Sequence, residues 1–335
     1  MYVAEVHNET DTSHRGSARR YLGLCRCDAC RAARDYPARP VTIVVPFAAG
    51  GGTDLLARMI GARLGQRLGT TFIVDNKPGA GAVIGANFVA KAVPDGYTLL
   101  MATSTPMAIN ATLHKSLPYD PDTDFIPIAA VAEVPFILVV NPSLPVNSVQ
   151  ALIRYARDNP GKLSFGSSGP GAPHHLFMEL FKSMTGTDMT HIPYKGTLPA
   201  LNDVIAGHIP LMFCDFAPAV AQFKAGTVRP LGISTRTRIP AVADIPTIDE
   251  AGVPGFEAAA WQMLVAPAKT PRDIVEKLHA ETKSVLDLPE IKEQIVRGGL
   301  VSMPNPSVDA LHSYVRSEIV RWGTIVRQAG IAGSQ

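Results

Sequence analysis

Short apolar runs alternate along this chain with longer stretches whose apolar positions recur at helical spacing. Runs of about five residues bounded by glycine, proline or polar residues are typical of buried strands. Because the connections between the two kinds of segment are short, the alternation predicts an α/β fold with mainly parallel sheets and helices on both faces. The clearest helical stripe is formed by Leu55, Leu56, Met59, Ile60, Leu64 and Leu68.

The other expected elements follow from the same patterns. The stretch from Phe125 to Val140 is interrupted by Pro127, Glu133 and Pro135, so it predicts two buried strands instead of a membrane span. Helix starts are indicated at 147–150, where Gln150 can reach back to the cap, and at Thr270 with Pro271 in the first turn. We expect strands at 42–46, 71–76, 98–102, 136–140, 162–166, 190–193, 211–215, 229–234 and 258–266, and helices at 173–185, 198–206, 217–225, 289–297 and 307–329.

Two glycine-bearing loops each follow an expected strand and lead into an expected helix. The first runs from Phe47 through three consecutive glycines to Asp54, and the second runs from Gly166 to His175. A helix N-terminus leaves backbone N–H groups unpaired and carries a partial positive charge, so it binds anions readily. Two such loops, far apart in sequence, predict two half-sites for one anionic ligand. The alternative is that glycine only forms tight turns there.

Six short motifs follow one another from about Tyr36 onward. They are PFAAGGGTD at 46–54, VDNKPGAG at 74–81, PDGYTLL at 94–100, LPYD at 117–120, PYKG at 193–196 and AGHI at 206–209. In this order and spacing they resemble the periplasmic solute receptors of tripartite tricarboxylate transporters, often called the Bug family. The resemblance extends to the C-terminus.

The resemblance implies a fold, a function and a location. The fold is a two-domain periplasmic-binding-protein-like fold of type II, with the ligand cleft between the domains. If the strands at 136–140 and 258–266 cross between them, domain 1 comprises 36–138 plus 260–335 and domain 2 comprises 139–259. The implied protein is a periplasmic monomer that binds a small carboxylate, partly through ordered water, and delivers it to the large and small membrane subunits of a transporter.

Residues near the loops and strand ends are the candidate ligand contacts. Phe47 is expected to pack against the carbon skeleton of the ligand, while Ser104 and Thr105 follow a strand end where α/β proteins line a crevice. Thr53 or Asp54 can instead cap the first helix, and capping is favoured for Asp54 because a carboxylate repels an anion. Packing is the alternative for His174, solvation for Lys195 and capping for Asp215. The complete expected set is Phe47, Ala48, Gly51, Gly52, Thr53, Asp54, Ser104, Thr105, Ser167, Ser168, Gly169, His174, Lys195 and Asp215.

Templates for catalysis and for cofactor binding do not match the chain. The run from Gly79 to Gly85 misses the dinucleotide fingerprint by one residue, and neither a phosphate-binding loop nor a nucleophile elbow occurs. His175 and Glu179 are too few ligands for zinc, so His175 is expected to pack or to lie on the helix surface. We expect no cofactor, no metal and no serine paired with a base. An enzyme on the same fold is therefore the less favoured alternative, and a ligand-presenting sensor is another.

The first 35 residues differ from the rest. They are polar, rich in Arg and His, and lack the apolar segment of a signal peptide. Cys25, Cys27 and Cys30 suggest a zinc site, but a structural zinc site needs four ligands and only His7 or His14 could supply the fourth. We therefore expect an atypical, disordered extension. The formal net charge of the whole chain is only +2, which argues against nucleic-acid binding, and the pattern predicts no direct membrane insertion.

Overall fold

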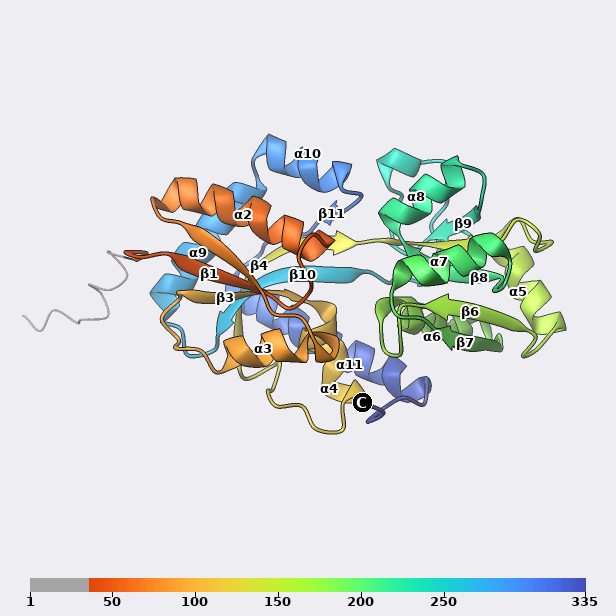
Figure 1. The fold of residues 1–335 in the computed structure, drawn as a ribbon, viewed down its shortest axis with the longest axis horizontal. Coiled ribbons are helices and arrows are strands. Elements are labelled where there is room, and N and C mark those ends of the chain that lie inside the picture. The colour runs from red at the N-terminus through yellow and green to blue at the C-terminus, as the bar shows by residue number, and fades with distance from the viewer. Residues whose placement is uncertain (1–35) are drawn as a thin grey trace, which may run out of the picture.

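The computed structural model describes residues 36–335 and arranges them in two lobes, each built on its own sheet (Figure 1). The expected extension at 1–35, with its three clustered cysteines, lies outside the described residues. Within the described part of the chain, helices and strands alternate as the sequence pattern predicts, and the α/β class is confirmed.

The first lobe contains a six-stranded sheet in the order β11-β4-β10-β3-β1-β2. Strand β1 pairs in parallel with β2 and β3, because α2 and α3 return the chain to the same edge each time. The strands are β1 (Val41–Val45), β2 (Phe72–Asn76), β3 (Thr98–Thr103), β4 (Phe125–Val134), β10 (Ala260–Pro267) and β11 (Val301–Ser302). The helices are α2 (Gly52–Leu68), α3 (Val83–Ala90), α4 (Asn110–Leu113), α9 (Arg272–Leu286), α10 (Pro289–Arg297) and α11 (Val308–Gln328), with the short helices η1 (Ala80–Ala82) and η2 (Thr105–Ile109).

The second lobe contains a five-stranded sheet in the order β7-β6-β8-β5-β9. Strand β6 pairs in parallel with β7 and β8, so the carboxyl ends of these three strands lie at one edge. The strands are β5 (Phe136–Val140), β6 (Leu163–Ser167), β7 (Met189–Pro193), β8 (Leu211–Asp215) and β9 (Arg229–Ile233). The helices are α5 (Val149–Asp158), α6 (Pro173–Thr185), α7 (Thr197–Ala206), α8 (Phe216–Lys224) and η3 (Pro240–Val242).

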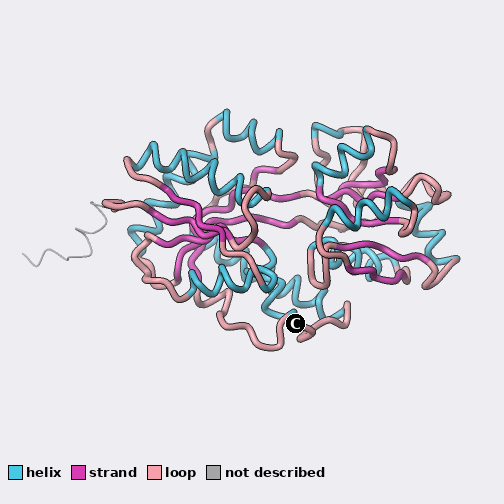
Figure 2. The backbone as a smooth tube through the Cα atoms, in the orientation of Figure 1, coloured by secondary structure: helices cyan, strands magenta, loops and turns pink. Residues whose placement is uncertain are grey.

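The chain crosses between the lobes in extended form (Figure 2). Strand β4 is separated from β5 only by Pro135, and the return passes from β9 to β10. These crossings make both sheets mixed, because five of the nine strand pairings in the described chain are antiparallel. The expectation of mainly parallel sheets is therefore wrong. A strand that enters from the other lobe runs against its neighbours, and local periodicity carries no sign of that direction.

Most expected elements are present, but three local details differ. Ser148 is the N-cap of α5 and accepts the Ala151 N–H at 3.1 Å, whereas Gln150 makes no bond to the cap in the described structure. Thr270 does not cap α9; its hydroxyl donates to the carbonyl of residue 267 at 2.7 Å. Leu55 is 59% exposed and lies outside the buried stripe of α2.

Helix α11 contacts the second lobe through an aromatic stack and is held to β10 by a buried carboxylate. Trp322 stacks on Phe177 of the second lobe, with ring centroids 5.5 Å apart. The indole N–H groups of Trp261 and Trp322 donate to the same oxygen of Glu318, at 2.9 and 2.8 Å. The Arg321 guanidinium lies 3.0 Å from the other oxygen. Glu318 is 4% exposed, so these donors replace the water that a buried carboxylate would otherwise need.

We expect Glu318→Gln to lower the free energy of unfolding by about 1–3 kcal/mol, because a charged acceptor shared by two buried indoles becomes a neutral amide. Urea denaturation followed by tryptophan fluorescence measures the change. Glu293→Gln is the control, since the Glu293 side chain is 60% exposed in its pair with Arg297 and such pairs contribute little. Equal stability of the two variants would contradict the role of Glu318.

Candidate functional site

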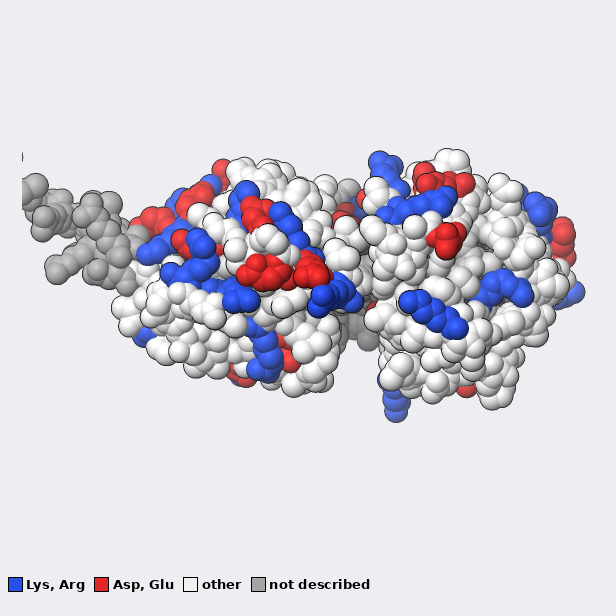
Figure 3. All heavy atoms as spheres, turned by 90° about the horizontal axis from the view of Figure 1, so that it is seen from above, with Lys and Arg blue, Asp and Glu red and all other residues white. Residues whose placement is uncertain are grey.

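A cavity of about 460 Å³ lies between the two lobes. Figure 3 shows that a groove separates the lobes on one face of the molecule. The cavity walls come from loops at the carboxyl ends of β1, β2, β3 and β6, which is where α/β proteins bind ligands. The lining residues are Phe47, Ala80, Gly81, Thr105, Asn110, Leu113, His114 and Gln335 of the first lobe and residues 168–173 of the second.

The loop between β1 and α2 leaves backbone amides free. Gly51 is the N-cap of α2 and has no side chain to accept from the first turn. In the described structure, the N–H groups of Gly52, Thr53 and Asp54 have no backbone acceptor. Helix α2 begins on the side of the first lobe that faces the second (Figure 1). The loop therefore has the free donors and the helix polarity that the anion-binding prediction requires.

Asp54 shapes this loop without capping the helix. It is the third residue of α2, so the expectation that Thr53 or Asp54 is the cap is wrong. The Asp54 carboxylate is 2% exposed and accepts from the Gly50 N–H at 2.9 Å, from Arg58 at 3.0 Å and from Asn76 at 3.0 Å. These bonds, led by the one from Arg58, lower the pKa of Asp54 to about 2.

The turn before α3 contributes to the cavity and was absent from the expected site. Ala80 and Ala82 both adopt positive φ angles, +46° and +75°, and two such residues in one turn are costly without a compensating role. The Asn110 amide donates to the Gly81 carbonyl at 2.9 Å, while its buried oxygen has no described partner. The glycines of this turn follow a strand parallel to β1, which is the signal that could have placed the turn in the site.

The second glycine loop differs from the expected amide cradle because its own side chains and carbonyls use several of its N–H groups. The Gly169 N–H donates to the Ser167 hydroxyl at 3.0 Å, and the Gly171 N–H donates to Nδ1 of His175 at 3.2 Å. The Ala172 N–H bonds to the Gly169 carbonyl at 3.3 Å, and residue 170 is proline. What this loop presents to the cavity is therefore chiefly the side chain of Ser168.

Ser168 is hydrogen-bonded to a histidine, so the expectation that no serine pairs with a base is wrong. Its Oγ lies 2.9 Å from Nδ1 of His174, whose Nε2 lies 3.0 Å from Asp215 Oδ2. The Thr197 hydroxyl donates to the same carboxylate oxygen at 2.6 Å. Burial raises the pKa of Asp215, but His174 and Thr197 outweigh it and the pKa is lowered. In the same loop, the N–H groups of Gly169, Gly171 and Ala172 already have acceptors and are not free to stabilise an oxyanion.

A pair of stacked histidines packs behind the same loop. His175 and His191 stack with ring centroids 3.7 Å apart, and His191 lies 2.6 Å from the Ser167 hydroxyl. Burial lowers the pKa of His175 to about 3 and that of His191 to about 4, so both rings are neutral near pH 7. His175 is buried, in agreement with the packing interpretation.

The expected ligand residues fall into two groups. Those that line the cavity are Phe47, Thr105, Ser168 and Gly169. Two of the residues that do not line it are Lys195, which is exposed and forms no ion pair in the described structure, and Ser104, which is buried. The others that do not line the cavity are Ala48, Gly51, Gly52, Thr53, Asp54, Ser167, His174 and Asp215.

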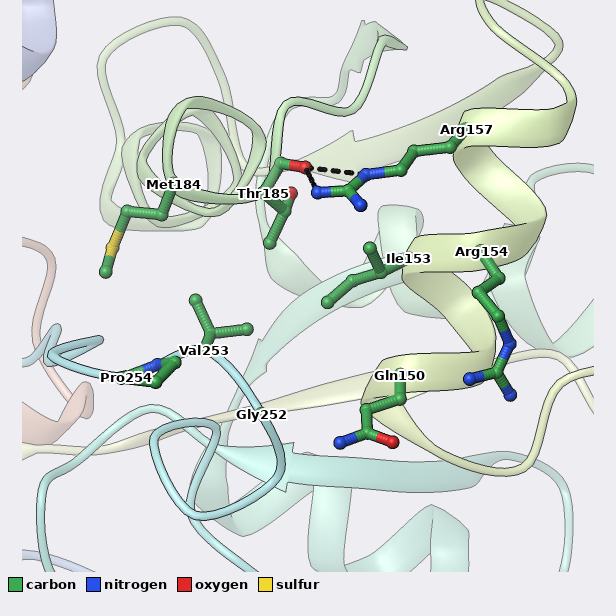
Figure 4. A pocket seen from close by; sticks show the side chains of 9 residues that line it. All are labelled: Gln150, Ile153, Arg154, Arg157, Met184, Thr185, Gly252, Val253 and Pro254. Atoms are coloured by element: carbon green, nitrogen blue, oxygen red, sulfur yellow. Dashed lines mark hydrogen bonds between the residues drawn. The ribbon is translucent and has the colours of Figure 1, made fainter.

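A smaller cavity, of about 280 Å³, lies within the second lobe (Figure 4). Gln150, Arg154 and Arg157 of α5 face Met184 and the turn at 252–254 across it. The Arg157 guanidinium donates to the Thr185 carbonyl at the end of α6, at 3.0 Å from Nε. No residue of the first lobe lines this cavity. Of its two arginines, Arg157 already donates to a backbone carbonyl. It is a weaker candidate than the cavity between the lobes.

Other kinds of site have little support in residues 36–335. No group of three or more His, Cys, Asp or Glu side chains is arranged there to hold a metal ion. Cys214, the free cysteine of this range, is buried, and burial raises the pKa of its thiol. No helix in the described chain is both long enough and apolar enough to cross a membrane.

Asp54 supplies a pH-dependent test of the first loop. Its pKa is lowered from 3.8 to about 2, so its stabilising effect is complete above pH 4 and is lost as the pH falls through 2. We expect Asp54→Asn to lose on the order of 2 kcal/mol of unfolding free energy at pH 7, and about half of that difference at pH 3. Urea denaturation at pH 7 and at pH 3 measures this difference in unfolding free energy. The exposed Asp158→Asn control is expected to change little, and a pH-independent loss in Asp54→Asn would contradict the assignment.

Comparison with known proteins identifies the fold. Protein BugT of Bordetella pertussis is 35% identical over 299 residues, which are 88% of this chain and 90% of that protein. The structure of R. palustris Rpa4515 with adipate covers 89% of this chain and 99% of that one, with 41% identity and a TM-score of 0.78. MatC from Rhodopseudomonas palustris with bound malate covers 87% and 100%, with 34% identity and a TM-score of 0.74. The expected periplasmic-binding-protein-like fold is confirmed.

The family is shown by a match over most of the chain. The model described as "Tripartite tricarboxylate transporter family receptor" matches residues 56–331. This range includes strands and helices of both lobes and most residues that line the cavity, although Phe47 and Gln335 lie outside it. The chain belongs to the tripartite tricarboxylate transporter receptor family.

Proposed function

We propose that this chain binds a small carboxylate between its lobes and delivers it to the large and small membrane subunits of a tripartite tricarboxylate-type transporter. The receptor acts in the periplasm, where receptors of this family work. The observation that carries the proposal is that loops of both lobes enclose one cavity, and that the loop beginning at Phe47 leads to free first-turn amides of α2.

The two walls of the cavity suit two parts of a ligand. One carboxylate binds at the amides of Gly52 and Thr53, which do not line the cavity themselves but follow the cavity-lining Phe47 in the same loop. The helix N-terminus there favours negative charge. The unpartnered oxygen of Asn110 accepts from a bound water or from a hydroxyl of the ligand. The ring of Phe47 contacts the carbon chain of the ligand, and the Ser168 hydroxyl hydrogen-bonds to the end of the ligand farthest from α2. Both lobes thus contact one molecule, which is what closure requires.

The ligand class follows from cavity size and from the relatives. A volume of about 460 Å³ lies within the range of small-molecule sites. Rpa4515 binds adipate and MatC binds malate, both small dicarboxylates. We propose that the ligand of this chain is a dicarboxylate or hydroxycarboxylate of similar length.

Catalysis is the second candidate, because Ser168, His174 and Asp215 form a connected series of hydrogen bonds. An acyl transfer also needs donors aimed at the developing oxyanion. The N–H groups of Gly169 and Gly171 are already bonded to side chains. Binding without chemistry therefore accounts for the loop better than hydrolysis does.

We expect Gly51→Asp to raise the Kd for adipate and malate on the order of 100-fold or more, because the new carboxylate occupies the first-turn amides and repels the ligand. The fold is expected to persist, since aspartate is a favourable N-cap and the backbone of Gly51 is extended, with φ of −77°. Isothermal titration calorimetry measures the affinity, and circular dichroism checks the fold.

Gly51→Ala is the matched control. An added Cβ there meets only the Ala48 carbonyl, at the ordinary distance of 3.6 Å, and leaves the amides free. We expect its Kd to stay within about threefold of the wild type, a difference below 1 kcal/mol. Wild-type affinity in Gly51→Asp would remove this loop from the site.

We further propose that 36–138 with 260–335 form one domain and 139–259 the other, and that ligand closes the cleft between them. Small-angle X-ray scattering is expected to show a smaller radius of gyration with saturating ligand. Gly51→Asp at the same ligand concentration is expected to show no change. Superimposable curves for the wild type with and without ligand would count against closure.

A further inference from the structure

Ser168 is the hydroxyl that the second lobe presents to the cavity, and its partner is a buried histidine. His174 is 4% exposed. Its Nδ1 lies 2.9 Å from Ser168 Oγ and its Nε2 lies 3.0 Å from Asp215 Oδ2. Phe136 packs edge-on against the ring, with centroids 4.9 Å apart. These contacts come from three separate segments and hold the imidazole in one orientation.

The chemistry of Asp215 determines where the ring proton lies. An ionised carboxylate only accepts hydrogen bonds, and Thr197 already donates to Oδ2 at 2.6 Å. The Nε2 of His174 must therefore carry a proton and donate it to Asp215. In the neutral ring Nδ1 is then an acceptor, so the hydroxyl of Ser168 donates inward to it. The ligand meets only the lone pairs of Ser168.

Protonation of the ring reverses this polarity. Imidazolium donates from both nitrogens, so Nδ1–H then donates to Ser168 Oγ. The hydroxyl proton of Ser168 is released and can donate to a ligand carboxylate. Asp215 is the charged group that contacts the ring, while Phe136, Thr197 and Ser168, which reach it from the other segments, are uncharged. No Lys or Arg of the described chain forms an ion pair with Asp215.

We propose that His174 is a positioning residue that sets which ligand group Ser168 accepts: a hydroxyl or ammonium when the ring is neutral, and a carboxylate when it is protonated. The inference rests on the proposed function and deepens it. A ligand with a second carboxylate at Ser168 takes up one proton when it binds. A ligand of equal length that ends in a hydroxyl takes up none.

The test compares adipate with 6-hydroxyhexanoate, which has the same chain length and one carboxylate replaced by a hydroxymethyl group. Calorimetry at pH 8 is run in buffers of different ionisation enthalpy. We expect uptake of about one proton with adipate and none with 6-hydroxyhexanoate. The Kd for adipate is expected to rise about tenfold per pH unit above pH 8, as linkage to one proton requires. Equal proton counts for the two ligands would overturn the proposal.

Asp215→Asn separates this role from a purely structural one. The carboxamide can donate to Nε2, which moves the ring proton to Nδ1 and turns the Ser168 hydroxyl outward without any added charge, as in other histidines whose carboxylate partner is replaced. We expect this variant to bind adipate without proton uptake and with a Kd independent of pH. Ser168→Ala is expected to lose the proton uptake as well. A merely structural Asp215 would weaken binding and leave the proton count unchanged.

Imidazole ¹⁵N NMR of the ligand-free protein provides a readout that does not depend on binding. With the His174 signal identified by its loss in His174→Asn, we expect the Nε2–H tautomer in the wild type and the Nδ1–H tautomer in Asp215→Asn. Failure of the wild type to bind either acid would overturn the proposed function, and the tautomers would then decide the positioning role alone. An Nδ1–H tautomer in the wild type would overturn the proposal.

Discussion

The arrangement of the two lobes depends on the hydrogen bonding of the extended segments that cross between them. Strands β4 and β10 pair in antiparallel fashion from Phe125 opposite Pro267 to Val134 opposite Ala260. In the second lobe the chain that follows β4 pairs instead with β8 and β9, and the Phe136 N–H donates to the Ser234 hydroxyl at 2.9 Å. These crossings join the sheets at one place and leave the loops at the strand ends to face each other across the cavity.

Helix α11 reinforces this junction from outside the sheets. Arg321 donates to the carbonyl of Glu257, just before β10. Glu318 accepts hydrogen bonds from the indole N–H groups of one tryptophan in β10 and one in α11. The lobes also approach closely at two glycines. A Cβ on Gly171 would lie 2.2 Å from Leu113 of the first lobe, and one on Gly299 would lie 2.1 Å from Phe216 of the second. Both glycines also have positive φ angles, so backbone conformation and packing both favour glycine there.

Carboxylates near the cavity serve to hold loops and side chains. Asp54 holds the first loop through Gly50 and Arg58, and Asp215 holds His174 through Nε2. Each negative charge is balanced by its own donors, so neither needs the ligand as a partner. A site for an anion can therefore contain acidic residues close by, provided that amides and hydroxyls are the groups that face the ligand.

The sequence by itself determined the α/β class, most element positions and the two glycine loops, because each depends on local periodicity and turn chemistry. Helix α10 at Pro289–Arg297 and the division of the stretch from Phe125 to Val140 into two strands are examples. Ordered motifs also predicted the family, which the match over residues 56–331 confirmed.

Only the tertiary structure decided strand direction, the fate of the loop amides and the partners of the polar side chains. The antiparallel crossings depend on chain paths between lobes, which periodicity cannot report. Ser168 and Asp215 are far apart in sequence, and they meet on His174 only because β6 and β8 end at the same edge of one sheet. Asn110 likewise reaches the cavity because η2 and α4 turn back toward Gly81. Contacts of this kind are set by packing, and packing is a property of the folded chain.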